Sequence, residues 1–317
     1  MASSFGAAAQ QANERETVRV GILQYGTVSW ELDAMTRNGI DERHGIDVEL
    51  VPFAGEDASN VALQAGAVDM IVSDWLWVSR QRATGADFTF APYSTSVGSV
   101  MVSADSDLQE LVDLKDRTIG VAGGPLDKNW LLIQALAKRE GVDLSAENEV
   151  VFGAPPLLMA KAESGELDAV LNFWHYAARL EAQGFRTLIS GTEAAMAMGA
   201  SGPVAAIGWV FRDSFAEENP EAIEGFLAAS RQTKALLKSS DAAWAELAPL
   251  VKAEDERTLD VLRDRYREGI PQRSAAEEVK DTRALYRVLA DIGGERLVGP
   301  SPELVDGTYF TDPKNGT

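Results

Sequence analysis

The amino-acid sequence repeats itself at a spacing of 99 residues, and this repeat constrains the fold more than any other feature. Gly21 in the segment Val-Arg-Val-Gly-Ile corresponds to Gly120 in Arg-Thr-Ile-Gly-Val, since 120 − 21 = 99. The same spacing relates further pairs of identical residues, namely Phe53 and Phe152, Gly66 and Gly165, Asp69 and Asp168, Trp75 and Trp174, and Gly85 and Gly184. Repetition of this kind indicates a duplicated structural unit. A chain of 317 residues is long enough for two lobes that each bury a core.

Both copies alternate short β-branched segments with longer helical segments. In the first copy we expect strands at 18–23, 48–53 and 70–73, and helices at about 29–43, 57–65 and 75–83. In the second copy we expect strands at 118–122, 150–152 and 169–172, and helices at 129–139, 156–163 and 174–183. This alternation is typical of βαβ units. We therefore predict an α/β protein with two lobes, each a mostly parallel sheet flanked by helices.

The pattern changes after Gly202. Residues 204–211 predict one more strand, and Asn219-Pro220-Glu221 is typical of a helix start, with a capping residue, a proline at the first position and an acid beside it. From there to about residue 292 we expect successive amphipathic helices, with breaks near 239–241 and 269–271. Residues 299–317 are rich in Pro, Gly and Asp and predict a loop.

The composition excludes several classes of function. Asp and Glu number 49 against 29 Lys and Arg, and a net charge of −20 argues against nucleic acid or an anionic membrane as the partner. The chain has no cysteine, which excludes disulfides, thiol nucleophiles and zinc ribbons. Its two histidines, His44 and His175, are not spaced as metal ligands, and the common nucleophile and phosphate-loop motifs are absent. We therefore expect no catalytic residue, metal or cofactor, and no inserted membrane segment.

Two short segments carry most of a family resemblance. They are 113–120, Asp-Leu-Lys-Asp-Arg-Thr-Ile-Gly, and 165–169, Gly-Glu-Leu-Asp-Ala. Together with segments 18–35 and 61–74, they resemble bacterial solute-binding proteins of ABC importers, most of all the aliphatic sulfonate, taurine, nitrate and thiamine-precursor group. The resemblance implies the type II periplasmic-binding-protein fold. Such a clamshell closes about a hinge on a small molecule and delivers it to the transmembrane subunits of a permease.

The resemblance also implies limits for the two lobes. Residues 17–101 and 206–317 would form lobe one, residues 102–205 would form lobe two, and residues 1–16 would be a flexible remnant of an export signal. We accordingly expect a periplasmic, monomeric protein. The ligand would lie between the lobes, because ligands of open α/β sheets bind at the carboxyl ends of strands, beside helix N-termini.

The loop after the first strand of each copy should then lie at the cleft. The candidate ligand residues are Gln24, Tyr25, Thr27 and Trp30 in the first copy, and Gly124, Asp127 and Lys128 in the second. Their backbone amides and hydroxyl hydrogens can hold a polar ligand group. The alternative interpretation is a pair of turns and caps that only start helices. Asp127 stands where sulfonate-binding members typically carry serine.

The third strand of each copy ends in an aromatic-rich segment. The candidates there are Asp74 and Trp75 in the first copy, and Asn172, Trp174 and His175 in the second. Two facing aromatic groups can hold a planar group or a cation, and Asp74 can hold an amine. The alternative is that these rings pack helices against the sheets.

Thr95 and Ser96 offer hydroxyl groups near the expected hinge, although small polar residues are also usual in any hinge.

Two ligand classes stay open at this point. One is a sulfonate or similar oxyanion, and the other is a heteroaromatic or amine-bearing compound such as a thiamine-precursor-like pyrimidine. Two functions also stay open: a transport receptor, or a ligand-sensing or accessory periplasmic protein that is not coupled to transport.

Overall fold

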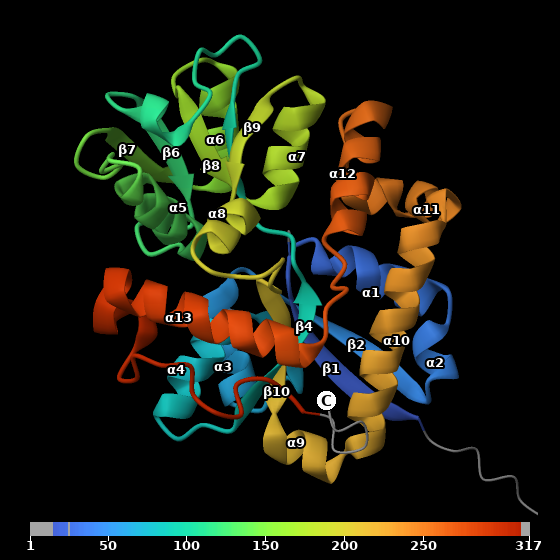
Figure 1. The fold of residues 1–317 in the computed structure, drawn as a ribbon. Helices are drawn as coiled ribbons and strands as arrows, with labels where there is room; N and C mark the ends of the chain where they lie inside the picture. The colour runs from blue at the N-terminus through green and yellow to red at the C-terminus, as the bar shows by residue number, and fades with distance from the viewer. Residues whose placement is uncertain (1–14, 25, 312–317) are drawn as a thin grey trace, which may run out of the picture.

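The computed structural model describes residues 15–24 and 26–311, and within them two five-stranded sheets lie one above the other (Figure 1). The first sheet has the strand order β2 (Ile46–Phe53), β1 (Glu16–Leu23), β3 (Met70–Ser73), β10 (Ile207–Arg212) and β4 (Phe88–Ser94). The second has the order β7 (Glu149–Gly153), β6 (Thr118–Ala122), β8 (Ala169–Asn172), β5 (Ser99–Val102) and β9 (Arg186–Ser190).

The two sheets share one topology. In each sheet the strand in fourth place, β10 or β5, runs antiparallel to both of its neighbours, whereas the pairs among the first three strands are parallel. Each of these antiparallel strands follows directly after the chain has crossed from the other lobe. The prediction of two α/β lobes with mostly parallel sheets is therefore confirmed.

The internal repeat appears as equivalent helices and equivalent hydrogen bonds. Helix α3 (Glu56–Gln64) and α6 (Pro155–Glu163) begin 99 residues apart, as do α4 (Trp75–Ala83) and α7 (Trp174–Ala182). Asp69 accepts a hydrogen bond from the backbone N–H of Arg19 at 2.8 Å. Asp168 accepts the equivalent bond from Thr118 at 2.8 Å. The repeat thus preserves the contacts that fix the start of the third strand in each lobe.

The helix expected at 29–43 is in fact two helices, α1 (Val28–Arg37) and α2 (Ile40–Arg43). Gly39 separates them with a left-handed φ of 58°, a conformation that glycine adopts at little cost. In the second lobe the corresponding helix α5 (Lys128–Arg139) is unbroken, and η1 (Leu111–Leu114) and α8 (Gly191–Ala197) complete the lobe.

The C-terminal third is helical, as predicted, but has one break more than expected. Its helices are α9 (Asp213–Glu218), α10 (Pro220–Ser239), α11 (Asp241–Val251), α12 (Glu256–Glu268) and α13 (Ala275–Val298). The unpredicted break follows α11, where Lys252 adopts a left-handed φ of 51° and Asp255 caps α12 by accepting a bond from Thr258 N–H at 2.7 Å. The preceding strand β10 begins at Ile207 rather than at 204.

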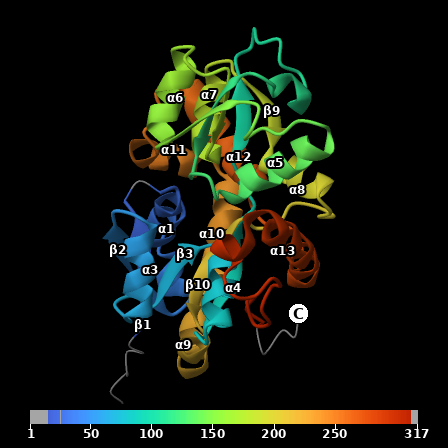
Figure 2. The same ribbon diagram turned by 90° about the vertical axis from the view of Figure 1, so that its left-hand side faces the viewer.

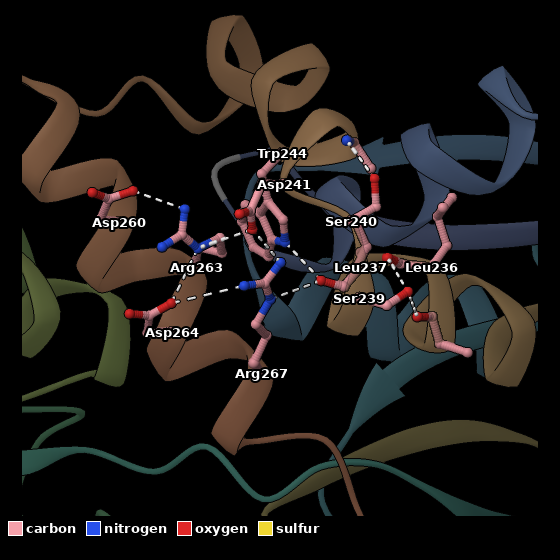
Figure 3. A network of polar contacts seen from close by, with 12 residues as sticks. Leu236, Leu237, Ser239, Ser240, Asp241, Trp244, Asp260, Arg263, Asp264 and Arg267 are labelled. Carbon is pink, nitrogen blue, oxygen red and sulfur yellow. Dashed lines mark hydrogen bonds and ion pairs between the residues drawn. The ribbon is translucent and has the colours of Figure 1, made fainter.

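Polar contacts fix the corner between α10, α11 and α12 (Figure 3). The Arg267 side chain donates to the carbonyl oxygen of Leu237 at 3.0 Å and pairs with Asp241 at 2.7 Å. Arg263 lies beside it and pairs with Asp260 at 2.8 Å. Arg267 thus joins α12 to a carbonyl group at the end of α10, which also accepts from the indole N–H of Trp244 in α11 at 2.9 Å.

The helices α12 and α13 both reach the second lobe. Helix α12 packs on α7, and α13 packs on α4 of the first lobe and on α5 of the second (Figures 1 and 2). One buried cluster therefore contains Trp75 from the first lobe, Leu131 from the second and Leu289 from α13. Within the described residues, no helix is long and apolar enough to cross a membrane.

Candidate functional site

A cavity of about 440 Å³ lies between the two lobes, beside the crossover from β4 to β5. Its lining comes from the crossover, from β9 and the start of α8, from α7 and from the end of α12, and includes Thr95, Ser96, Trp174, Ser190 and Arg265. A volume of this size suits a small organic molecule. Three of the predicted ligand residues, Thr95, Ser96 and Trp174, are brought together here.

The crossover is tied to the end of α12. The backbone N–H of Thr95 donates to the carbonyl oxygen of Gly269 at 2.8 Å, and the Thr95 hydroxyl donates to the same oxygen at 3.2 Å. The N–H of Ser96 donates to the Ser94 hydroxyl at 3.1 Å. These bonds fix the backbone at Thr95 and Ser96, two residues of the cavity lining.

Trp174 forms one wall of the cavity and also joins the lobes. Its ring meets the ring of Trp30 edge to face, with 5.8 Å between the centroids, and Trp30 in turn meets Trp244 at 6.0 Å. Trp30 is only 5% exposed. Trp30 thus packs in the core beneath Trp174 and does not line the cavity, whereas Trp174 does.

The cationic group in the wall is Arg265, which pairs across the lobes with Glu181 of α7. Its Nε and Nη2 atoms lie 2.8 and 2.6 Å from the two carboxylate oxygens of Glu181, and its Nη1 atom lies 2.6 Å from Glu268. The hydrogen bond with Glu181 raises the pKa of Arg265 above its ordinary value, so that the guanidinium stays charged. A fork of this kind both binds and orients α12 on α7.

A second contact between the lobes joins α7 to the end of α11. Arg179 donates to the carbonyl oxygen of Val251 at 3.0 Å and to that of Lys252 at 3.2 Å, and it pairs with Glu254 at 2.5 Å. A side chain of the second lobe thus satisfies carbonyl groups at the end of α11, one of the C-terminal helices. Arg179 and Arg265 together hold α7 against the C-terminal helices.

The loops after β3 and β6 meet in a different place, outside the cavity lining. Asp74 caps α4 by accepting from Trp77 N–H at 2.8 Å, and its other oxygen lies 2.7 Å from the Lys128 ammonium of the opposite lobe. Burial alone would raise the pKa of Asp74, but the charge and hydrogen bond of Lys128 outweigh it and lower this pKa. Burial would lower the pKa of Lys128, but the charge and hydrogen bond of Asp74 outweigh burial, and the pKa of Lys128 is raised. Both groups of the pair are therefore ionised.

Two further carboxylates lie near this ion pair. Asp127 caps α5 by accepting from Trp130 N–H at 3.0 Å, and burial raises its pKa. The pKa of Glu56, at the start of α3, is raised by burial and then by the charge of Asp74. Both groups interact with Lys128, which is already bonded to Asp74.

The remaining predicted residues of the first two loops belong to turns. Gln24 is exposed and its N–H donates to the carbonyl oxygen of Phe53 at 3.0 Å, while Tyr25 lies outside the described residues. Thr27 precedes α1 without a capping bond from its side chain. Gly124 has a left-handed φ of 81° and its carbonyl oxygen accepts from Asp127 N–H.

Three other predicted residues lie around the helix starts, of which Trp75 and Asn172 are buried and His175 is partly buried. Trp75 is 4% exposed and packs against Tyr286 of α13 at a centroid distance of 6.2 Å. Asn172 is 1% exposed and donates to the carbonyl oxygen of Pro155 at 2.9 Å. His175 follows Trp174, and burial, with the charge of Arg179, lowers its pKa to about 4, so that it is neutral at pH 7.

The sequence interpretation missed the polar groups that α12 and the β9–α8 turn bring to the cavity. Arg265 and Glu268 lie in the helical region after the repeat, where no second copy marks them. Ser190 and Glu193 form a capping box at the start of α8, a pattern visible in the sequence as Ser-x-x-Glu.

Two sheets of one strand order, joined by two crossovers with a cavity beside them, define the type II periplasmic-binding-protein fold. Solved structures share it. The periplasmic aliphatic sulphonate binding protein SsuA from Escherichia coli aligns with a TM-score of 0.74 and 19% identity, covering 93% of this chain and 92% of that one. The alkanesulfonate-binding protein SsuA from Xanthomonas axonopodis, bound to MOPS, gives 0.69 and 17%, covering 94% and 99%. Both are described as binding proteins, the class expected for this chain.

A product of the Candida albicans CA3427 gene, described as having the generic periplasmic binding protein fold, aligns with a TM-score of 0.60 and 15% identity, covering 93% of this chain and 97% of that one. Residues 40–242 match the model of the family named NMT1/THI5 like. The chain therefore belongs to the NMT1/THI5-like family. No curated protein sequence matches it.

Proposed function

We propose that the protein is a periplasmic solute receptor of an ABC importer, which captures a small organic molecule between its lobes and delivers it to the transmembrane subunits of a permease. The observation that carries the proposal is the interlobe cavity of about 440 Å³, whose walls come from both lobes and from the crossover between them. A site built this way changes shape when the lobes move about the crossovers.

The division into lobes is part of the same proposal. The expected limits are 17–101 with 206–317 for one lobe and 102–205 for the other. We move the first limit to residue 98, because β5 (Ser99–Val102) lies in the second sheet, and we propose the crossovers near 95–98 and 198–206 as the hinge. The family and the fold of the SsuA neighbours support a binding function. The ligand residues that we propose for the cavity are Thr95, Ser96 and Trp174.

The proposal is tested by native mass spectrometry of the purified protein, followed by thermal unfolding with a panel of amines, heteroaromatic compounds, sulfonates and nitrate. A solute present at one hundred times its Kd stabilises the folded state by about 2.7 kcal/mol. We expect one chemical class to raise the midpoint of unfolding and a Trp174→Ala variant to lose that increase. No retained solute, together with no increase for any compound, would contradict a receptor function.

A further inference from the structure

The charges that line the interlobe cavity identify the class of solute, if the proposed receptor function holds. Among the described residues of the lining, Arg265 is the one cation, and it stands with three carboxylates, those of Glu181, Glu193 and Glu268. Arg265 is bonded to Glu181 through two nitrogen atoms and to Glu268 through the third. An oxyanion entering the cavity would therefore compete with two carboxylates for this guanidinium.

The third carboxylate, that of Glu193, is not paired with Arg265, the one cation among the described residues of the lining. Glu193 accepts from the backbone N–H of Ser190 at 2.8 Å and from its hydroxyl at 2.7 Å, bonds that complete the capping box of α8. These are neutral donors, so they leave the charge in place. The lining therefore holds more negative than positive groups, which repels an anion and attracts a cation.

The positive groups next to the lining are engaged elsewhere: Arg273 donates to the carbonyl oxygen of the lining residue Pro203 at 3.0 Å and pairs with Asp281 at 2.8 Å. His175, next to Trp174, is neutral at pH 7 because burial lowers its pKa to about 4. Lys128, in the neighbouring interlobe cluster, is bonded to Asp74 at 2.7 Å and lies close enough to Asp127 and Glu56 for their charges to raise its pKa.

The rest of the lining suits the body of an organic cation. The indole of Trp174 offers a ring to which ammonium and protonated ring nitrogens are attracted, and Val97, Met101 and Ala177 make an apolar wall beside it. The hydroxyl oxygens of Ser96 and Ser99 can accept hydrogen bonds from N–H groups.

We propose that the solute of this cavity is an organic cation, a protonated amine or protonated heterocycle, and not a sulfonate. Its positive group would lie among Glu181, Glu193 and Glu268, of which Glu193 is not paired with Arg265, and its apolar body would lie against Trp174. This class differs from the aliphatic sulphonates that the E. coli SsuA protein binds.

The test compares three probes that share one ring, namely benzylammonium, benzyl alcohol and benzenesulfonate, by isothermal titration at pH 7. We expect benzylammonium to bind at least about tenfold more tightly than benzenesulfonate, the factor that corresponds to roughly 1.4 kcal/mol. The Glu268→Gln variant removes one carboxylate and keeps the interlobe pair of Arg265 with Glu181. We expect it to weaken benzylammonium and to strengthen benzenesulfonate.

Glu217→Gln on α9 is the matched control, because Glu217 is exposed and lies far from the cavity lining. It carries the same charge change and should alter none of the three affinities. Absence of benzylammonium binding, tighter binding of benzenesulfonate, or equal effects of the two variants would overturn the inference. Tighter sulfonate binding would leave the receptor function standing, whereas the receptor function fails only if no solute is retained and none stabilises the protein.

Discussion

The ammonium nitrogen of Lys128 lies 2.7 Å from the carboxylate of Asp74, and this ion pair joins the first turns of two helices that belong to different lobes. Both residues were candidate ligand groups on sequence grounds, yet each is the other's partner. The side chains are 25% and 23% exposed, so the pair is shielded from water far more than a surface ion pair is. It is therefore a contact that opposes opening of the lobes.

Replacing Asp74 by Asn should weaken that contact without removing the helix cap, because Asn caps helices as well as Asp. We expect the lobes to open further in the absence of solute and the free energy of unfolding to fall by about 1–3 kcal/mol. Opening is measured by electron spin resonance between labels at Val61→Cys on α3 and Leu157→Cys on α6. Both sites are exposed, and the chain has no cysteine of its own. An unchanged distance between the labels would show that the pair does not restrain the lobes.

Replacing Lys128 by Gln should change how stability depends on pH. In the native protein the pKa of Asp74 is lowered, so its contribution to stability is present above its ordinary pKa and is lost as the pH falls through the lowered value. Without Lys128, burial raises this pKa, and the ionised carboxylate destabilises the fold. The deficit relative to the native protein, measured by urea unfolding, should be larger at pH 7.5 than at pH 4. A deficit independent of pH would contradict this account.

Glu278, at the second crossover, should make the protein less stable as the pH rises, whereas Asp74 makes it more stable. One carboxylate oxygen accepts from Ala205 N–H at 3.1 Å, the other is buried without a partner among the described residues, and burial raises the pKa to about 6 from 4.5. Arg273 opposes this rise and Asp281 adds to it. The pKa is raised by 6 − 4.5 = 1.5. Ionised Glu278 therefore lowers the free energy of unfolding by about 2 kcal/mol above pH 6, and this loss disappears as the pH falls to about 4.5.

The Glu278→Gln variant tests this assignment. Its stability relative to the native protein should be greater at pH 7.5 than at pH 4.5 by about 2 kcal/mol. Urea unfolding at the two pH values measures the difference, and Glu217→Gln, exposed on α9, serves as the control with no such change. A relative stability that is the same at both pH values would exclude Glu278 as the group that titrates near pH 6.

The repeated glycines of the first strands have a packing reason that a substitution can measure. A Cβ atom at Gly120 would lie 2.6 Å from the Leu167 side chain, and one at Gly21 would lie 3.0 Å from Ile71. We expect Gly120→Ala to lower the free energy of unfolding by about 1–3 kcal/mol through overpacking. Gly55→Ala is the control, because its Cβ would meet nothing within 4 Å; as Gly55 is the N-cap of α3, we expect only the smaller loss that comes from a poorer cap. Equal effects would refute the packing explanation.

The strands and helices of the repeat could be predicted closely, because each one appears in both copies of the sequence with the same type of residues and the same spacing. The strands expected at 70–73, 118–122 and 169–172 have those limits in the structure. Lys252 gave no such signal, since a left-handed residue other than glycine cannot be recognised from its type, and the break after α11 was missed.

The candidate site was predictable only in part, because it depends on contacts between distant segments. Trp174 lies at a place that the repeat defines, and Thr95 and Ser96 lie near the hinge that the family resemblance implies. Arg265 reaches the cavity only because α12 packs across the hinge on α7. Nor does the sequence show that Trp174 and Trp244 cover Trp30. Which of these three rings is buried and which lines the cavity depends on how their helices pack.

The central claim is that a solute binds between the lobes and closes them, and the distance between spin labels at positions 61 and 157 tests it most directly. The labels lie on α3 and α6, equivalent helices of the two lobes. We predict that the solute identified by native mass spectrometry shortens and narrows the distance distribution, and that Trp174→Ala, which removes a cavity wall, abolishes the change at the same concentration. Binding of that solute with no change in the distance, or an equal change in the Trp174→Ala variant, would contradict the claim.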